Sequence, residues 1–171
     1  IQLAKYVVLY CNLNGIDISH LKLQKLLYYI QSWHLVYFEK ELLFSDTPEA
    51  WLNGPVYTTV YSDYFHKQGY KMNDLIVLDQ DNSNLEKEYS ELSNKLADKA
   101  ALVDKVLLKY STLTAEKLVL LTHCEMPWSK AREKCEDMTC REPISIDDMY
   151  SYYSSLITNK AKQVVYLCTT K

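Results

Sequence analysis

The scarcity of helix-breaking residues constrains this chain more than any other feature of its sequence. Its 171 residues include only 3 glycines and 4 prolines, whereas leucine, lysine, glutamate, alanine and tyrosine recur over long stretches. Glycine and proline interrupt helices and form most tight turns, so their scarcity favours helices and leaves few places for hairpins. We therefore predict a mainly α fold, a compact multi-helix domain with a small β element.

Hydrophobic spacing predicts where the helices lie. In residues 3–12 apolar side chains recur at the i, i+3, i+4, i+7 intervals of one helix face. The run from Leu21 to Phe38 is predicted to be the central helix, with Asp17 or Ser19 as its N-cap. The polar residues 82–90 either extend a later helix or stay mobile. Further helices are predicted at residues 55–68, 92–110, 114–121, 126–135 and 146–156.

One short run, Leu75 to Leu78, has β-type composition and lies between turn-forming residues, so it predicts a strand. A single strand needs a partner. The candidates are Val164–Leu167 and Leu42–Phe44, and the sequence does not choose between them. We divide the chain into one helical domain, residues 1–158, and a C-terminal tail or appended strand, residues 159–171.

The stretch "EAWLNGPVYTTVYSDYF", Glu49 to Phe65, holds one of the three glycines, followed at once by a proline. Proline is well placed in the first turn of a helix, where its missing N–H costs nothing, so Pro55 is predicted to begin a helix. Gly54 permits a sharp turn before that start. Trp51 is expected to be buried and to anchor the junction.

Composition limits the classes of partner and compartment. The 19 basic and 22 acidic residues give a net charge of -3, which disfavours nucleic acid as a partner. No apolar run approaches the roughly 18 residues that span a bilayer, and the first residues lack the pattern of a signal peptide. We expect a soluble, cytoplasmic protein that does not bind a membrane.

The cysteines are predicted to be free thiols. Their number is odd and no CxxC spacing occurs, which disfavours a disulfide framework. His123 and three of the cysteines are zinc-ligand types, but their spacing does not match common zinc motifs, so we predict no metal. The five cysteines are Cys11, Cys124, Cys135, Cys140 and Cys168.

The sequence contains no motif that names a reaction. It has no glycine-rich phosphate loop, no HExxH, no GxSxG and no dinucleotide-binding fingerprint. His34 and His123 are each expected to be buried histidines bonded to a backbone carbonyl rather than catalytic groups. The 15 tyrosines form clusters that suit either an interaction surface or half-buried helix faces.

Three blocks, in this order and spacing, resemble the Panacea domain family, which includes the SocA-like proteins. They are "LKLQKLLYYIQSWHL" (Leu21 to Leu35), "AWLNGPV" (Ala50 to Val56) and "LTHCEMPWSKAR" (Leu121 to Arg132). With the helices that join them, the resemblance covers roughly residues 3–156. By position, the family signature falls on Leu23, Gln24, Lys25, Leu26, Leu27, Tyr28, Trp33, His34, Ala50, Trp51, Gly54, Pro55, Val56, Thr122, His123, Pro127 and Trp128.

The resemblance implies a helical, non-catalytic antitoxin without cofactors that neutralises a cognate protein toxin by direct binding. One branch of the family delivers its toxin to a ClpXP-type protease, so a proteolytic adaptor, or a phage-encoded modulator of a host protein, is the alternative. Oligomeric state stays open. We expect signature residues to define the fold more often than they touch a partner, with exposed Lys25, Trp33 and Tyr57 as the better contacts. The candidate partner-binding residues are Gln24, Lys25, Tyr28, Trp33, His34, Trp51, Gly54, Pro55, Tyr57, His123 and Trp128.

Overall fold

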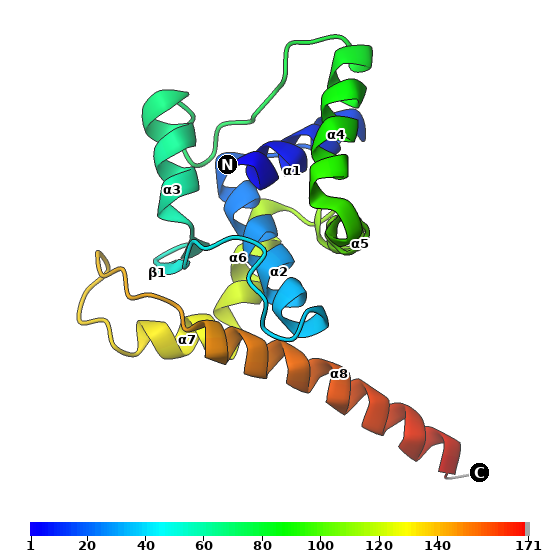
Figure 1. The fold of residues 1–171 in the computed structure, drawn as a ribbon. Coiled ribbons are helices and arrows are strands. Elements are labelled where there is room, and N and C mark those ends of the chain that lie inside the picture. Colours follow the sequence, from blue (N-terminus) through cyan, green and yellow to red (C-terminus); the bar gives the residue numbers. More distant parts are fainter. Residues whose placement is uncertain (170–171) are drawn as a thin grey trace.

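The computed structural model describes the backbone of residues 1–169 and the side chains of residues 1–158. The fold is mainly helical, with one small antiparallel hairpin, as predicted (Figure 1). A π-helical segment, Ser62–Lys67, continues α3. The elements are α1 (Gln2–Leu13), α2 (His20–Tyr37), β1 (Glu49–Trp51), β2 (Gly54–Val56), α3 (Thr58–Tyr61), α4 (Asn82–Leu96), α5 (Ala100–Tyr110), α6 (Ala115–His123), α7 (Met126–Arg132) and α8 (Ile146–Thr169).

Helix α2 is the centre of the fold. Every residue from Ile18 to Ser32 is buried, polar ones included, so this helix has no solvent-facing side over most of its length. Helices α1, α5, α6 and α8 and strand β2 all pack against it. Of the two predicted caps, Ser19 is the N-cap, and its hydroxyl accepts from the Lys22 N–H at 3.2 Å.

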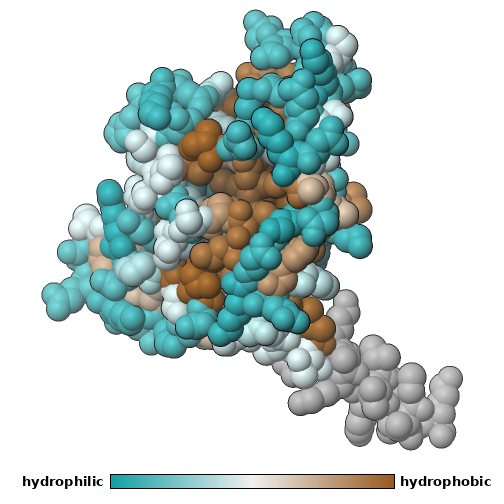
Figure 2. Space-filling model, viewed as in Figure 1, coloured by the Kyte–Doolittle hydropathy of each residue, from teal (hydrophilic) through white to brown (hydrophobic). Residues whose placement is uncertain are grey.

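Helices α1 and α4 pack against each other beside this centre. The Tyr6 hydroxyl donates to Asp104 Oδ1 at 2.7 Å and lies 2.7 Å from the Tyr89 hydroxyl, so one polar cluster links α1, α4 and α5. Figure 2 shows apolar side chains gathered along the middle of this face, over α1 and α2, with hydrophilic residues on either side. In the part of the chain that the structure describes, no helix is both long and apolar enough to cross a membrane.

The prediction of a single helix over residues 92–110 is wrong. Residues 82–96 already form α4, and the chain turns at Ala97, whose φ of 51° lies in the left-handed region. A short 3₁₀ turn, Ala97–Lys99, then leads into α5. Continuous helical periodicity concealed this break because both helices present apolar side chains to the same core.

The β element lies elsewhere than predicted. Strands β1 and β2 pair antiparallel with Trp51 opposite Gly54, whereas Leu75 forms only an isolated bridge to Ser19. Pro55 therefore belongs to β2, and the helix predicted to begin there starts at Thr58. A proline is tolerated here because Pro55 stands opposite Ala50, whose N–H donates to Glu142 and not to β2, so the missing N–H costs no bond between the strands. The strand offered at Val164–Leu167 is wrong too, because those residues continue α8 to Thr169.

Candidate functional site

The three sequence blocks meet around the β1–β2 hairpin. Strand β2 packs against α2 and α6, and β1 packs against α7. Segments far apart in the chain thus surround a hairpin of six strand residues and a two-residue turn. This junction is held by the side chains described next.

Lys25 reaches from α2 into the hairpin. Its side chain is fully buried, and Nζ donates to the Pro55 carbonyl oxygen at 2.8 Å. Within residues 1–158 no acidic side chain forms an ion pair with it. Burial without a compensating charge disfavours the ammonium form and lowers the pKa of Lys25 to about 7. The expectation that Lys25 is exposed is wrong.

Gly54 is the residue that lets Lys25 fit. A Cβ atom at this position would lie 2.7 Å from Lys25 Cε and 2.8 Å from Thr122 Oγ1. Its φ of 92° is also one that side chains with a Cβ rarely adopt. Position 54 therefore requires glycine for two reasons: the hairpin needs a positive φ there, and the Lys25 side chain leaves no room for a Cβ atom.

Gln24 ties the end of the hairpin to α2. Its Oε1 accepts from the Tyr57 backbone N–H at 2.8 Å, and its Nε2 lies 3.2 Å from His20 Nε2. Gln24 and His20 are fully buried, and so is Tyr57, although we expected Tyr57 to be exposed. Neither Gln24 nor Tyr57 can touch a partner unless the fold opens.

The third block closes the hairpin from the other side. Trp128 Nε1 donates to the Trp51 carbonyl at 3.0 Å, and the Trp128 ring stacks on His123 at 3.9 Å. Burial, with the nearby Lys25 charge as a smaller cause, lowers the pKa of His123. Arg132, which the site prediction did not include, donates to the Ala50 carbonyl at 3.2 Å. Its place at the end of the third block was the only available signal.

His34, Tyr28 and Trp33 lie apart from the hairpin, further along α2. His34 Nδ1 is 2.8 Å from the Glu41 carbonyl oxygen, which confirms the predicted buried histidine bonded to a carbonyl. Tyr28 is fully buried. Trp33 is half-buried, and its Nε1 donates to the Tyr110 hydroxyl at 3.1 Å. The predicted site residues therefore form two groups rather than one.

Glu125 is the hub of a second polar cluster that sequence reasoning missed. Its carboxylate accepts from the hydroxyls of Tyr29, at 3.2 Å, and Tyr153, at 2.5 Å. Burial raises the pKa of Glu125 to about 7, while these two hydrogen bonds pull it down. No local pattern marks this residue, because its partners come from α2 and α8.

The outer surface of the hairpin carries an aromatic ladder, here called the hairpin face: Glu49, Trp51, Tyr61, Phe65 and Arg141. The Trp51 ring lies 4.2 Å from the Arg141 guanidinium carbon and 4.8 Å from the Tyr61 ring centre, and Tyr61 stacks on Phe65 at 5.2 Å. Trp51 Nε1 donates to Glu49 Oε2 at 2.7 Å. Trp51 is half-buried, so the prediction that it is buried is wrong.

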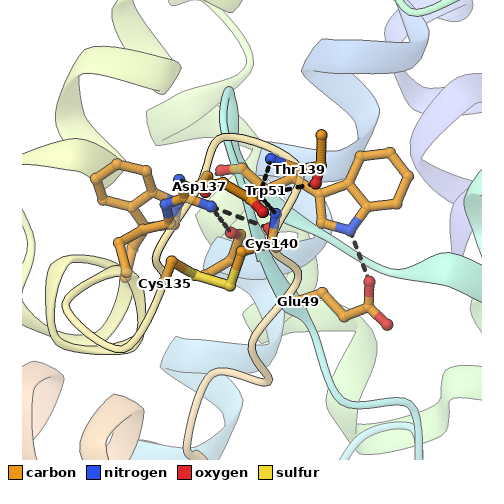
Figure 3. Close-up of a disulfide and its surroundings, with 9 residues drawn as sticks. Glu49, Trp51, Cys135, Asp137, Thr139 and Cys140 are labelled. Atoms are coloured by element: carbon orange, nitrogen blue, oxygen red, sulfur yellow. Dashed lines mark hydrogen bonds between the residues drawn. A yellow bond between two sulfur atoms is a disulfide. The ribbon is translucent and has the colours of Figure 1, made fainter.

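Cys135 and Cys140 form a disulfide beside this face (Figure 3). The prediction that all cysteines are free is therefore wrong, although Cys11 and Cys124 are free as expected. The turn between the two cysteines brings their Cα atoms to 5.5 Å, within the range that a disulfide spans. The pairing also removes two of the four residues considered as zinc ligands.

Comparison with known protein families gives one match. A family model described as "Antitoxin SocA-like, Panacea domain" matches residues 23–129, more than half of the chain. The matched region contains most of α2, the hairpin, α6 and the start of α7, which together form the junction around Lys25. No curated protein and no solved structure matches the chain.

Proposed function

Because the chain belongs to the SocA-like Panacea family of antitoxin domains, we propose that it is a non-catalytic antitoxin that neutralises a small protein toxin by direct binding. Family membership supports an antitoxin role in general. The toxin, the contact surface and the fate of the complex are the parts that this proposal adds.

The observation that carries the contact surface is the partial exposure of Trp51 on the hairpin face. Binding energy in protein interfaces concentrates on Trp, Tyr and Arg side chains near the centre of the interface. Here Trp51 lies between Arg141 and Tyr61, and its backbone carbonyl accepts from Trp128. The hairpin face therefore offers an aromatic anchor that is already ordered before a partner arrives.

The buried signature residues hold the hairpin that carries this surface in place. Lys25 and Gln24 each bond the backbone of the hairpin, and Gly54 makes room for Lys25. Their proposed role in partner binding is indirect, because they position the hairpin. Among the candidate residues, Trp51, Trp33, His123 and Trp128 are only partly buried, and Trp51 is the one on the hairpin face.

The test is growth of a host that expresses the open reading frame adjacent to this gene, alone and with this protein. We expect the neighbour alone to arrest growth and the pair to grow. Trp51→Ala should weaken binding of the purified toxin by at least about tenfold. The matched control is Tyr37→Ala, which removes an aromatic side chain that is 61% exposed at the far end of α2.

A harmless neighbour, or toxicity that persists in the pair, contradicts the antitoxin proposal itself. Equal losses from Trp51→Ala and Tyr37→Ala contradict only the hairpin face as its contact surface. The lifetime of the toxin in the same cells separates two modes of action. A toxin that accumulates with this protein is stored, whereas one that disappears only in the presence of a ClpXP-type protease is delivered by an adaptor.

A further inference from the structure

The loop that holds the disulfide is attached to the hairpin at both of its ends. Before it, Arg132 donates to the carbonyls of Ala50, Asp137 and Cys140, at 3.2, 3.1 and 3.0 Å. After it, the Ala50 N–H donates to the Glu142 carbonyl at 2.7 Å, and the Ile144 N–H donates to the Pro48 carbonyl at 2.8 Å. The disulfide is therefore an addition to a loop whose ends are already fixed.

A turn between the cysteines brings them together. Asp137 Oδ1 accepts from the Thr139 N–H and hydroxyl, both at 2.7 Å, and from the Cys140 N–H at 2.9 Å. These bonds are local to the loop and do not depend on the sulfur–sulfur bond. They therefore keep the two thiols of the reduced protein close enough to meet without rearrangement of the core, although the loop is less ordered than when the sulfurs are bonded.

The segment is also accessible. Residues 136–139 are exposed, and both cysteines are half-buried. Exposed disulfides exchange with small thiols more readily than buried structural ones. Arg141 follows Cys140 directly and lies over the Trp51 ring. A change in the position of Cys140 therefore moves the backbone of a residue that belongs to the hairpin face.

We propose that Cys135 and Cys140 form a reversible thiol–disulfide site whose closure orders residues 135–141 and holds Arg141 over Trp51. The glutathione couple is the class of redox partner. One cysteine thiolate attacks a sulfur of oxidised glutathione and releases one glutathione thiolate. The second cysteine thiolate then attacks the protein sulfur of the mixed disulfide and releases the other glutathione. Two electrons pass to glutathione, and the two thiol protons end on the two reduced glutathione molecules.

Opening the disulfide restores the conformational freedom of a loop of six residues, while the bonds to Ala50 and Pro48 remain. The reduced protein therefore stays folded with a less ordered loop, and Arg141 covers Trp51 for less of the time. A stacked guanidinium contributes little when its own backbone is free to move. The redox state of the site is independent of the proposed function, whereas any effect on toxin affinity rests on it.

The experiment uses the whole chain without any partner. The protein is equilibrated in mixtures of reduced and oxidised glutathione, its thiols are alkylated, and Cys135 and Cys140 are located by peptide mapping. Trypsin then cleaves after Lys134 and Arg141 in samples at the two extremes. We expect alkylation of both cysteines to fall together as oxidised glutathione increases, and cleavage to be on the order of tenfold slower in the oxidised protein.

Two variants serve as controls. Cys124→Ser removes an exposed free thiol and should keep the full redox response. The double variant Cys135→Ser with Cys140→Ser should be cleaved in both buffers as fast as the wild-type protein in its reduced form. Its circular dichroism spectrum should be unchanged. The proposal is overturned if the two thiols stay alkylatable in every mixture, if excess reduced glutathione never opens the bond, or if both redox forms are cleaved at equal rates.

If the antitoxin proposal holds, the oxidised protein should bind the toxin more tightly than the reduced protein, because its hairpin face is better ordered. A toxin that binds both forms equally removes the link to function but leaves the redox site intact. A failure of neutralisation in cells leaves the redox result unaffected. The two proposals can therefore fail separately.

Discussion

Two ionisable groups, the fully buried Lys25 and the partly buried Glu125, show opposite consequences of removal from water. Burial lowers the pKa of Lys25 to about 7 and raises the pKa of Glu125 to about 7, because each charged form is costly away from water. Lys25 donates to one backbone carbonyl, whereas Glu125 accepts from two tyrosine hydroxyls. One holds the hairpin to α2, and the other joins α2 and α8 to the start of α7.

The difference shows how each region depends on pH. The unfolded chain keeps the Lys25 proton up to about pH 10.5 and the folded chain releases it near 7, so stability rises with pH across this window. Glu125 binds its proton more tightly when folded, so its contribution is present below about pH 4.5 and is lost as pH rises to about 7. The summed contribution of the two groups to the free energy of unfolding is therefore smallest near neutral pH.

The largest expected effect comes from closing the space that Lys25 occupies. Gly54→Ala places a Cβ against Lys25 and Thr122 and strains a φ of 92°, so the free energy of unfolding should fall by about 2–4 kcal/mol. Gly69→Ala is the matched control, because Gly69 has a φ of 82° but nothing within 4 Å of its Cβ position. It should cost only about 1–2 kcal/mol. Equal losses in urea denaturation would show that backbone strain alone explains Gly54.

Next in size is the pH dependence carried by Lys25. Lys25→Met keeps the length of the side chain and removes the group that titrates, so stability should no longer rise between about pH 7 and 10.5 through this residue. Lys22 and the buried histidines titrate as well. The quantity to compare is therefore the difference between the melting temperatures of the variant and the wild type at each pH. A constant difference from pH 7 to 10 would contradict a lowered pKa for Lys25.

Glu125→Gln should give the mirror image, with a smaller amplitude. The amide keeps an oxygen acceptor for the tyrosine hydroxyls and cannot ionise, so the variant should gain relative to the wild type as pH rises from 4.5 to 7. The expected gain is up to about 3 kcal/mol, because the pKa of about 7 already includes the hydrogen bonds from Tyr29 and Tyr153. A variant that loses stability over this range would show that the carboxylate is the preferred form.

The two smallest expected effects come from removing single tyrosine hydroxyls, and Tyr153→Phe is the larger of the two. It removes the hydroxyl that donates to Glu125 at 2.5 Å but keeps the ring, which packs against Trp33 at 5.3 Å. Loss of this donor should cost about 1 kcal/mol at neutral pH and less below pH 5, where Glu125 is protonated. The corresponding change in the other region, Tyr57→Phe, removes a hydroxyl with no hydrogen-bond partner among the described residues and should cost less still.

Much of the fold could be predicted from hydrophobic spacing and from helix-capping residues. The central helix and Ser19, one of the two residues predicted to cap it, are local features, and both are confirmed. The hairpin was misread because Pro55 is equally suited to a helix start and to a short ribbon. The choice depends on α2, whose Lys25 and Gln24 bond the backbone on either side of Val56.

The candidate site could be predicted only in part from the sequence. The resemblance selected Lys25, Gly54 and Trp128, which do meet in the fold, but it could not say that Lys25 faces inward. Lysine is rarely buried without a partner, so exposure was the reasonable expectation. Glu125 was missed because its partners are distant in sequence, and the Cys135–Cys140 bond because a spacing of five residues carries no recognised motif.

The sequence by itself determined the helical class, the position of the central helix, most of its neighbours and the family, because these depend on local periodicity and on ordered blocks of residues. Only the tertiary structure decided which polar groups are buried and what they bond. A side chain's exposure depends on every element packed around it, and the hairpin, the two ionisable groups and the disulfide all arise where distant segments meet. That is also where the proposed function lies.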